Sequence, residues 1–240
     1  MYNLIETPWI PVKTSSGVVS KIEPWRLTEH IRQDPIERLY AARPDFNAAL
    51  VQFLIGLVQT TMPPEDEDDW LERLEKPPKP EVLRKNFSDW SQAFNLHGAS
   101  PLFMQDFDEL TGENKSVSGL LIESPGEKTI EDNKDHFIKR DTVNKLCPSC
   151  AATALLTLQT NAPSGGAGHR TSIRGGGPLS TILVDVNQPL WNTISLNTLP
   201  KNLFERNVGG NPDLVTASDI FPWMAKTRVS DSKAGKDTTP

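Results

Sequence analysis

One segment in the first quarter of the chain constrains the fold most strongly, because its pattern requires burial on nearly all sides. Its apolar residues recur at the i, i+3, i+4, i+7 and i+8 spacing of a helix: Leu50, Phe53, Leu54, Leu57 and Val58. Val51 and Ile55 lie off that stripe, so few positions are left to face water. We expect a helix capped by Asp45, ended by Pro63 and Pro64, and buried nearly all round.

The rest of the chain predicts the α+β class. Its 240 residues, 37% of them hydrophobic, are enough for a core. Residues 9–12 and 18–22 flank a turn containing Gly17 and predict an N-terminal β-hairpin. Further helices are expected after the acidic run at 65–69 and through residues 83–94, whose aromatics we assign to the core. A short strand is expected over residues 120–122. We expect a single mixed domain over residues 1–229 with several helices and short sheets, and a disordered tail or truncated linker over 230–240.

A glycine-rich loop is expected between a helix and a strand. The helix begins at Cys150, with Ala151, Ala154, Leu155 and Leu158 on one face, and the β-branched residues of 179–186 predict the strand. Residues 163–178 hold six of the 15 glycines together with arginines and a histidine. Glycine lacks a Cβ and successive N–H groups can bind an anion, which favours contact with phosphate or a nucleic-acid groove. A flexible glycine-rich connection remains the alternative, since the spacing matches no standard nucleotide-binding fingerprint.

Basic residues gather in one part of an acidic chain. The net charge of −6 argues against non-specific nucleic-acid binding by the whole surface, but residues 134–178 hold six Lys and Arg against two Asp. Within this region His136, Phe137, Lys139 and Arg140 interleave an aromatic ring with cations. Such a mixture stacks on bases and neutralises phosphates. The alternative is a loop with a buried Phe137 and solvated cations.

The two cysteines, Cys147 and Cys150, have the C-x-x-C spacing that supplies two of the four ligands of tetrahedral zinc. His136 and His169 would complete a Cys2His2 set only with an unusual spacing, and a second C-x-x-C beyond residue 240 would be a better completion. A redox pair is the other interpretation, although residues 136–146 are too polar for the strand that such sites follow. The cysteine pair is therefore predicted to form half of a structural zinc site.

Other classes of protein are less consistent with the sequence. It has no apolar run of 18 residues and no signal peptide, so we expect a soluble cytoplasmic protein without a membrane segment. Ser164, Ser172 and His169 show no nucleophile or metal-dyad pattern, so no catalysis is assigned. Two alternatives stay open: an enzyme that binds phosphate or a nucleotide in the glycine-rich loop, and a scaffold whose loop docks a protein partner.

Several segments together resemble the N-terminal domain of the large subunit, the CasA family, of the type I-E CRISPR surveillance complex called Cascade. They are NLIETPWIPV, AALVQFLIGLVQ, NLHGASPLFMQ, LCPSCAATALLTLQTNAPSGGAGHRTSIRGGGPLSTIL and IFPWMAKTR. The resemblance covers essentially the whole chain. The cysteine pair followed by the glycine-rich loop and RGGGP is its most specific element.

The resemblance implies a non-catalytic subunit that reads the protospacer-adjacent motif in double-stranded DNA and promotes strand separation in antiviral defence. The loop would enter the minor groove, which is about 6 Å wide and admits backbone better than bulky side chains. Its implied contacts are Ser164, Gly165, Gly166, Ala167, Gly168, His169, Arg170 and Arg174. Ser164 and Ala167 interrupt a glycine run that is purer in some relatives.

The resemblance also implies partners and a metal. The partners are the CRISPR guide RNA, whose 5′ handle would lie near residues 136–140, the other Cascade subunits, and the helicase-nuclease that the complex recruits. Cys147 and Cys150 would hold half of a structural zinc site whose remaining ligands follow residue 240. The C-terminal four-helix bundle of the family is absent from this sequence, which leaves a fragment and a naturally short subunit as alternatives.

Overall fold

The structure is a computed structural model that describes residues 2–112, 114–139, 142–162, 180–207 and 216–226. Its strands are β1 (Ile10–Thr14), β2 (Val19–Ile22) and β3 (Ile36–Leu39). Its α-helices are α1 (Pro44–Thr61), α2 (Glu67–Glu75), α3 (Pro80–Ser88), α4 (Glu127–Glu131), α5 (Pro148–Asn161), α6 (Leu190–Leu196), α7 (Lys201–Asn207) and α8 (Ala217–Ile220). The 3-10 helices are η1 (Pro24–Thr28), η2 (Ser91–Phe94), η3 (Val117–Leu120) and η5 (Pro222–Met224). The predicted α+β class is confirmed.

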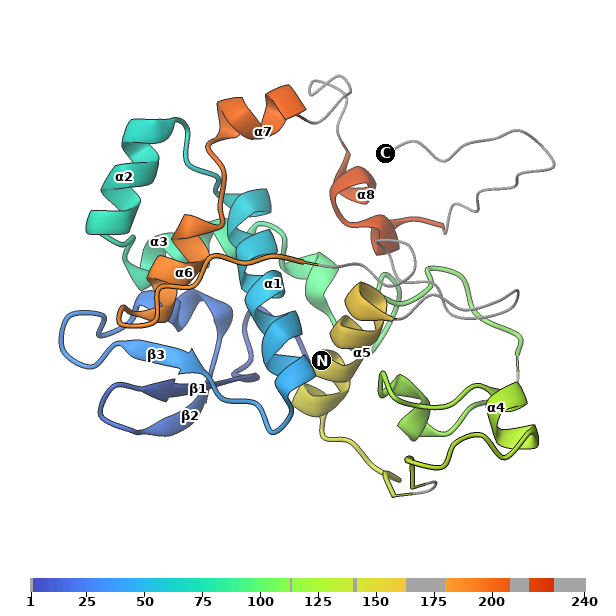
Figure 1. Cartoon of the computed structure of the whole chain (residues 1–240). Helices are drawn as coiled ribbons and strands as arrows, with labels where there is room; N and C mark the ends of the chain where they lie inside the picture. Colours follow the sequence, from blue (N-terminus) through green and yellow to red (C-terminus); the bar gives the residue numbers. More distant parts are fainter. Residues whose placement is uncertain (1, 113, 140–141, 163–179, 208–215, 227–240) are drawn as a thin grey trace.

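Helix α1 runs through the middle of the molecule, with α5 packed along it and α6 and the sheet to one side (Figure 1). All five residues of the predicted stripe are buried, and Val51 and Ile55 are partly buried against the same core. The predicted cap is wrong: the N-cap residue is Arg43, and Asp45 lies inside the first turn. Pro44 determines this start, since proline fits the first helical position, where no N–H is needed.

The N-terminal hairpin is confirmed. β1 pairs antiparallel with β2 through Ile10↔Ile22 and Lys13↔Val19, and Gly17 in the turn has a φ of +92° that favours glycine. The sequence analysis missed β3, which pairs antiparallel with the other edge of β1 and completes the order β2-β1-β3. A four-residue strand carries too short a pattern to be recognised alone.

The acidic run at 65–69 begins α2, as expected. Asp66 is the N-cap and accepts a hydrogen bond from the backbone N–H of Asp69 at 2.9 Å. The aromatics that follow belong to the core, also as expected: Phe87 is 1% exposed and Phe94 is 2% exposed. The Phe94 ring stacks on Phe103 with centroids 5.7 Å apart, so this part of the chain offers no free stacking platform.

Helix α5 is present as predicted, but it begins at Pro148, two residues before the expected Cys150, and it buries a different face. Its buried residues are Ser149, Ala152, Thr153, Ala154, Leu156, Thr157 and Thr160, whereas Ala151, Leu155 and Leu158 are half-buried. The hydroxyls of Thr153, Thr157 and Thr160 each donate to the carbonyl oxygen four residues earlier, at 2.7 to 2.8 Å. Because each hydroxyl is satisfied within the helix, threonine can face the core here, which apolar periodicity alone does not predict.

Two predicted strands are wrong. Leu120 is the last residue of the 3-10 helix η3, residues 121–122 form a bend and turn after it, and residues 180–185 are irregular. In the second segment the Leu183 N–H donates to Asn197 Oδ1 at 2.9 Å, and the Leu183 carbonyl accepts from Asn197 Nδ2 at 2.7 Å. A side-chain amide therefore takes the hydrogen bonds that a neighbouring strand would have taken. The glycine-rich residues 163–179 and the tail residues 227–240 lie outside the described chain.

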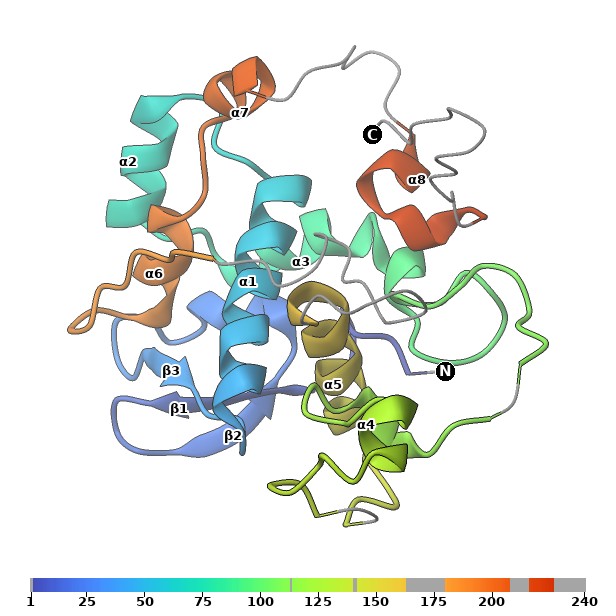
Figure 2. The ribbon, with the colours of Figure 1, turned by 45° about the vertical axis from the view of Figure 1, so that its right-hand side comes forward.

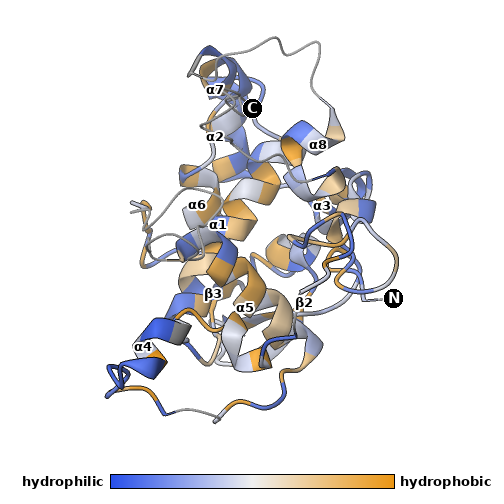
Figure 3. Cartoon of the chain, turned by 90° about the vertical axis from the view of Figure 1, so that its right-hand side faces the viewer, coloured by the Kyte–Doolittle hydropathy of each residue, from blue (hydrophilic) through white to orange (hydrophobic). Residues whose placement is uncertain are grey.

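Hydropathy along the ribbon separates the core from the segment around α4. Hydrophilic residues dominate α4 and the chain beside it, whereas α1 and α5 are largely apolar (Figure 3). Turned by 45°, the molecule again shows α4 at the end opposite α2 and α7 (Figure 2). Among the described residues, no helix combines the length and apolarity needed to span a bilayer.

Candidate nucleic-acid interface and cysteine pair

The structure describes five of the residues assigned to a site: His136, Phe137, Lys139, Cys147 and Cys150. The others lie outside the described chain, namely Arg140, Ser164, Gly165, Gly166, Ala167, Gly168, His169, Arg170 and Arg174. The described residues form two groups. The first is the segment after α4, and the second is the start of α5.

Helix α4 ends in a way that turns the chain outward into residues 134–139. Asn133 has a φ of +49°, a left-handed conformation that asparagine tolerates at the end of a helix. The Lys134 N–H then donates to the Thr129 carbonyl at 2.9 Å, which closes the last turn. His136 and Lys139 are exposed, and the ring of Phe137 is 101% exposed. The alternative of a buried Phe137 is therefore wrong.

The lysines near this segment differ in their partners. Lys128 Nζ lies 3.0 Å from Asp132, and Lys134 Nζ lies 2.9 Å from the other oxygen of the same carboxylate. Lys139 has no ion pair with another described residue, and the same holds for the exposed Lys145. The basic region seen in the sequence is thus partly neutralised within the fold. Among its described cations, Lys139, two residues from Phe137, and Lys145 stay exposed without an ion pair to another described residue.

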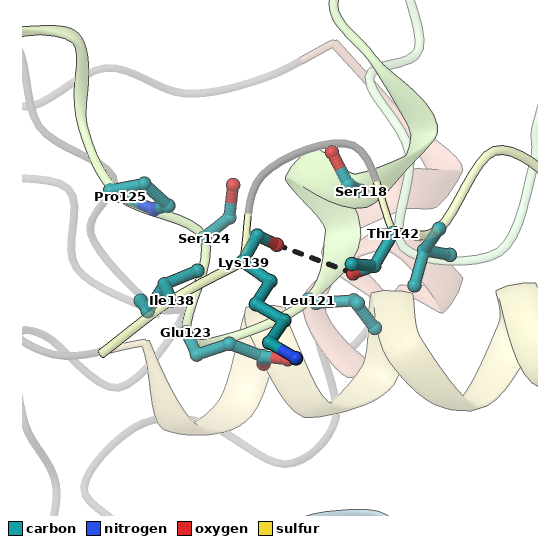
Figure 4. A pocket seen from close by; sticks show the side chains of 9 residues that line it. Ser118, Leu121, Glu123, Ser124, Pro125, Ile138, Lys139 and Thr142 are labelled. Atoms are coloured by element: carbon teal, nitrogen blue, oxygen red, sulfur yellow. Dashed lines mark hydrogen bonds between the residues drawn. The ribbon is translucent and has the colours of Figure 1, made fainter. Parts of the chain in front are cut away.

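A small pocket of about 60 Å³ lies beside Lys139 (Figure 4). Its lining residues are Ser118, Leu121, Glu123, Ser124, Pro125, Ile138, Lys139, Thr142 and Val143. The Thr142 hydroxyl donates to the Lys139 carbonyl at 3.3 Å, a local hydrogen bond between two residues of the pocket lining. The pocket therefore joins the turn after η3 to the segment that carries Phe137.

Beneath this pocket, Arg43 connects the turn after η3 to the start of α1. Its two terminal nitrogens each lie 2.7 Å from one oxygen of Glu123, and its Nε lies 3.0 Å from Asp45 Oδ1. These hydrogen bonds lower the pKa of Glu123, although its partial burial opposes the shift. The sequence analysis missed Arg43, because nothing local connects it to a carboxylate 80 residues away.

Cys147 is the N-cap of α5, and its sulfur accepts a hydrogen bond from the backbone N–H of Cys150 at 3.3 Å. The Ser149 hydroxyl lies 3.2 Å from the same sulfur and accepts a hydrogen bond from Lys21 Nζ. Tyr2 also lies close, since burial and then the charge of Cys147 raise its pKa. The tertiary fold brings Tyr2 and Lys21 to the cysteines, and no pattern in the sequence indicated either residue.

These contacts shift the pKa values of the two thiols in opposite directions. Partial burial alone would raise the pKa of Cys147, but hydrogen bonds with Cys150 and Ser149 and the charge of Lys21 lower it to about 7. The pKa of Cys150 is raised, first by burial and then by its hydrogen bond with Cys147. The pair thus favours a thiolate at the more exposed position.

Zinc ligation by His136 finds no support in the structure. Within the described residues, no third His, Cys, Asp or Glu joins the two cysteines in a group able to hold a metal ion. His169, the second histidine of that alternative, lies outside the described chain. The two thiols alone fit half of a tetrahedral site.

The acidity difference predicts the pH dependence of alkylation in metal-free protein. Cys147 reactivity with iodoacetamide should rise through a midpoint near 7, because the thiolate is the reacting form, whereas the raised pKa of Cys150 should give it a clearly higher midpoint. Peptide mass spectrometry separates the two sites. Ser149→Ala removes one hydrogen bond to the sulfur and should move the Cys147 midpoint upward. Equal midpoints for the two cysteines would contradict the arrangement.

Comparison with known proteins identifies the family. The model of the family described as CRISPR-associated protein Cse1 (CRISPR_cse1) matches residues 3–240. Thermus thermophilus CasA (Cse1) has a TM-score of 0.61 at 22% identity, over 82% of this chain and 41% of that chain. Thermobifida fusca Cse1 has a TM-score of 0.65 at 19% identity, over 97% of this chain and 45% of that chain.

A chain of a structure described as a CRISPR RNA-guided surveillance complex also matches, with a TM-score of 0.60 at 18% identity, over 82% of this chain and 43% of that chain. This chain therefore spans less than half the length of these structural relatives. The structural likenesses show a shared fold, and the family model spans nearly every residue. The chain belongs to the CRISPR-associated Cse1 family, as its resemblance to CasA implied.

Proposed function

We propose that this chain acts as a subunit of a CRISPR RNA-guided surveillance complex, Cascade, in antiviral defence. In that role it binds guide RNA through residues 136–140, reads the protospacer-adjacent motif in double-stranded DNA through residues 164–174, and promotes strand separation. Its further partners are the other Cascade subunits and the helicase-nuclease that the complex recruits. Family membership supports this role, and so does the fold shared with a chain of a surveillance complex.

The observation that carries the RNA-binding part is the complete exposure of Phe137 close to Lys139, which forms no ion pair with another described residue. A large apolar ring in water has no favourable role in the folded chain alone, because no burial compensates for its hydration. A ring that stacks on a base, next to a cation that contacts phosphate, is the combination that binds single-stranded nucleic acid. His136 adds a second exposed ring in the same segment.

A non-catalytic role is consistent with the burial of Ser149, a serine that contacts a lysine. Ser149 accepts a hydrogen bond from Lys21, which resembles a serine–lysine pair, but Ser149 is only 5% exposed. A substrate has no access to a hydroxyl that is packed against Cys147. The alternative of a nucleotide-binding enzyme depends on the glycine-rich residues alone, and the family match favours the complex subunit.

We also propose that Cys147 and Cys150 hold a structural zinc ion together with two further ligands. The lowered pKa of Cys147 and the nearby charge of Lys21 suit a thiolate ligand, which must be deprotonated to bind metal. When bound, zinc would fix the start of α5. Lys21 and Ser149 would then orient and neutralise the thiolates from outside the ligand set.

Phe137→Ala tests the RNA-binding proposal in the full chain assembled with its partner subunits and guide RNA. Stacking contributes roughly 1–3 kcal/mol per base, so the affinity for guide RNA should fall about 5- to 150-fold. Folding stability should stay unchanged, because the ring is fully exposed. Fluorescence anisotropy with labelled guide RNA measures the first quantity, and urea unfolding the second.

Two further variants make this test specific. Phe137→Tyr keeps an aromatic face and should retain most of the affinity. Leu110→Ala removes another exposed apolar side chain, 73% exposed, outside the proposed interface and should have no effect. If Phe137→Ala binds guide RNA as tightly as the original chain, the segment does not stack on RNA and the proposal fails at this site.

A further inference from the structure

We propose that Arg43 acts as a positioning residue that keeps Lys139 available for nucleic acid, by holding the Glu123 carboxylate that would otherwise pair with Lys139. The inference rests on the proposed function, since it assigns Arg43 a part in RNA binding without contact to RNA. It arises from the pocket of Figure 4, in which Glu123 and Lys139 line the same small space.

The Arg43 side chain is held in place from several directions. It contacts Asp45 through Nε and through one terminal nitrogen, at 3.0 and 2.9 Å. Its guanidinium carbon lies 5.2 Å from the centroid of the Phe46 ring. All three residues belong to the start of α1, the helix that the core encloses. The start of α1 therefore holds the Arg43 guanidinium in a fixed position beside Glu123.

Glu123 has the geometry of a carboxylate whose charge is fully engaged. Both of its oxygens accept from Arg43, at 2.7 Å each, in a bidentate pair. Such a planar fork binds a carboxylate more strongly than the single ammonium of lysine. Arg43 is therefore the preferred partner of Glu123 while both Arg43 and Lys139 are present.

Lys139 is the cation that this competition leaves unpaired. Its side chain runs along the pocket toward the carboxylate of Glu123 (Figure 4). Lys128 and Lys134 are already paired with Asp132. Within the described residues, Glu123, the carboxylate in the pocket of Lys139, is thus paired with Arg43. Asp132, the carboxylate beside Lys134, is paired with lysines instead.

Loss of Arg43 should therefore change the partner of Lys139. The Glu123 carboxylate would remain in the pocket without its guanidinium partner, and Lys139 would pair with it. Exposed ion pairs of this kind are weak, so the pairing should reduce the affinity for guide RNA by up to about fivefold. Since one phosphate contact is withdrawn, the log–log slope of affinity against salt should flatten by about 0.7 on single-stranded RNA.

The experiment compares four variants of the full chain, assembled with partner subunits and titrated with guide RNA over a range of salt concentrations. Lys139→Ala and Arg43→Ala should show the same loss of affinity and the same flatter slope. Arg43→Ala combined with Glu123→Gln should recover the original affinity for guide RNA, because the negative charge that would pair with Lys139 is gone. Lys134→Ala is the matched control and should change little, since Lys134 is paired with Asp132.

A second measurement without RNA separates the inference from the proposed function. Acylation of Lys139 by an amine-reactive ester, followed by mass spectrometry, should slow in Arg43→Ala and recover in the double variant. Unchanged acylation in Arg43→Ala, or a double variant as impaired as the single one, would overturn the role of Arg43. If Lys139→Ala binds guide RNA with unchanged affinity, Lys139 does not contact RNA, and the proposed function fails at this residue. This outcome is independent of the acylation result.

Discussion

Replacing both Gly166 and Gly168 by valine should abolish the preference of the assembled complex for DNA with the correct adjacent motif, while assembly with guide RNA survives. Both glycines lie outside the described residues, so the expectation follows from their chemistry. A valine side chain would block close approach of the backbone to the groove floor. β-Branched residues also disfavour the positive φ values that glycine permits.

The expected effect is large because the valine side chains would remove the proposed contact that distinguishes one adjacent motif from another. Specific binding of proteins to DNA typically exceeds non-specific binding by about a thousandfold or more, and the valine variant should retain only the non-specific part. Binding curves on duplexes that differ only in the adjacent motif measure this ratio. The two motifs should give the same curve for the variant.

Gly112→Val provides a matched control for the glycine variant. A Cβ at Gly112 meets nothing within 4 Å, and this exposed position lies outside residues 163–178. The control should discriminate between motifs as the original chain does. Full discrimination by a folded Gly166→Val, Gly168→Val variant would show that these residues are not the reader, and the scaffold interpretation of the loop would then be favoured.

The Trp9→Ala variant should lose about 3–5 kcal/mol of unfolding free energy, a large part of the roughly 5–15 kcal/mol that a typical domain has. Trp9 is 0% exposed, and its indole packs edge-on against Phe53 of α1 with centroids 5.2 Å apart. Its Nε1 also donates to the Leu4 carbonyl at 2.8 Å, an acceptor that alanine would leave unsatisfied. The variant therefore opens a cavity between the sheet and the central helix.

Urea unfolding followed by circular dichroism measures this loss. Val19→Ala is the control in the same sheet, since Val19 is 53% exposed and should cost much less. Trp9→Phe keeps part of the packing and should lie between the two, which preserves a measurement if the alanine variant does not fold. A cost below about 1 kcal/mol for Trp9→Ala would contradict the assignment of Trp9 to the centre of the core.

Local patterns predicted the elements whose signals lie within a few residues. The hairpin follows from two short apolar runs around Gly17, and α2 follows from an acidic run before an apolar stripe. The predictions of strands at 120–122 and 179–186 failed, because β-branched composition does not show whether a partner strand exists. At Leu183 the partner is the side chain of Asn197, which composition does not reveal.

For the candidate site, too, the sequence predicted some features and only the structure resolved others. The sequence was enough to select Phe137, Lys139 and the cysteine pair, because each selection depends on residue type and spacing within a few positions. The exposure of Phe137 was left open, because an aromatic residue in a polar loop can either fold inward or face a partner. Only the turn at Asn133 and the packing of Ile138 into the pocket resolve it.

By itself, the sequence determined the buried character of α1, the turn at Gly17, the thiols at the start of α5, and family membership through a pattern spread along the chain. Only the tertiary structure decided which distant groups meet. Lys21 reaches Ser149 across 128 residues, and Arg43 reaches Glu123 across 80. The physical reason is that charge pairing depends on distance in space, and neighbours in the folded chain are selected by core packing, which no local pattern encodes.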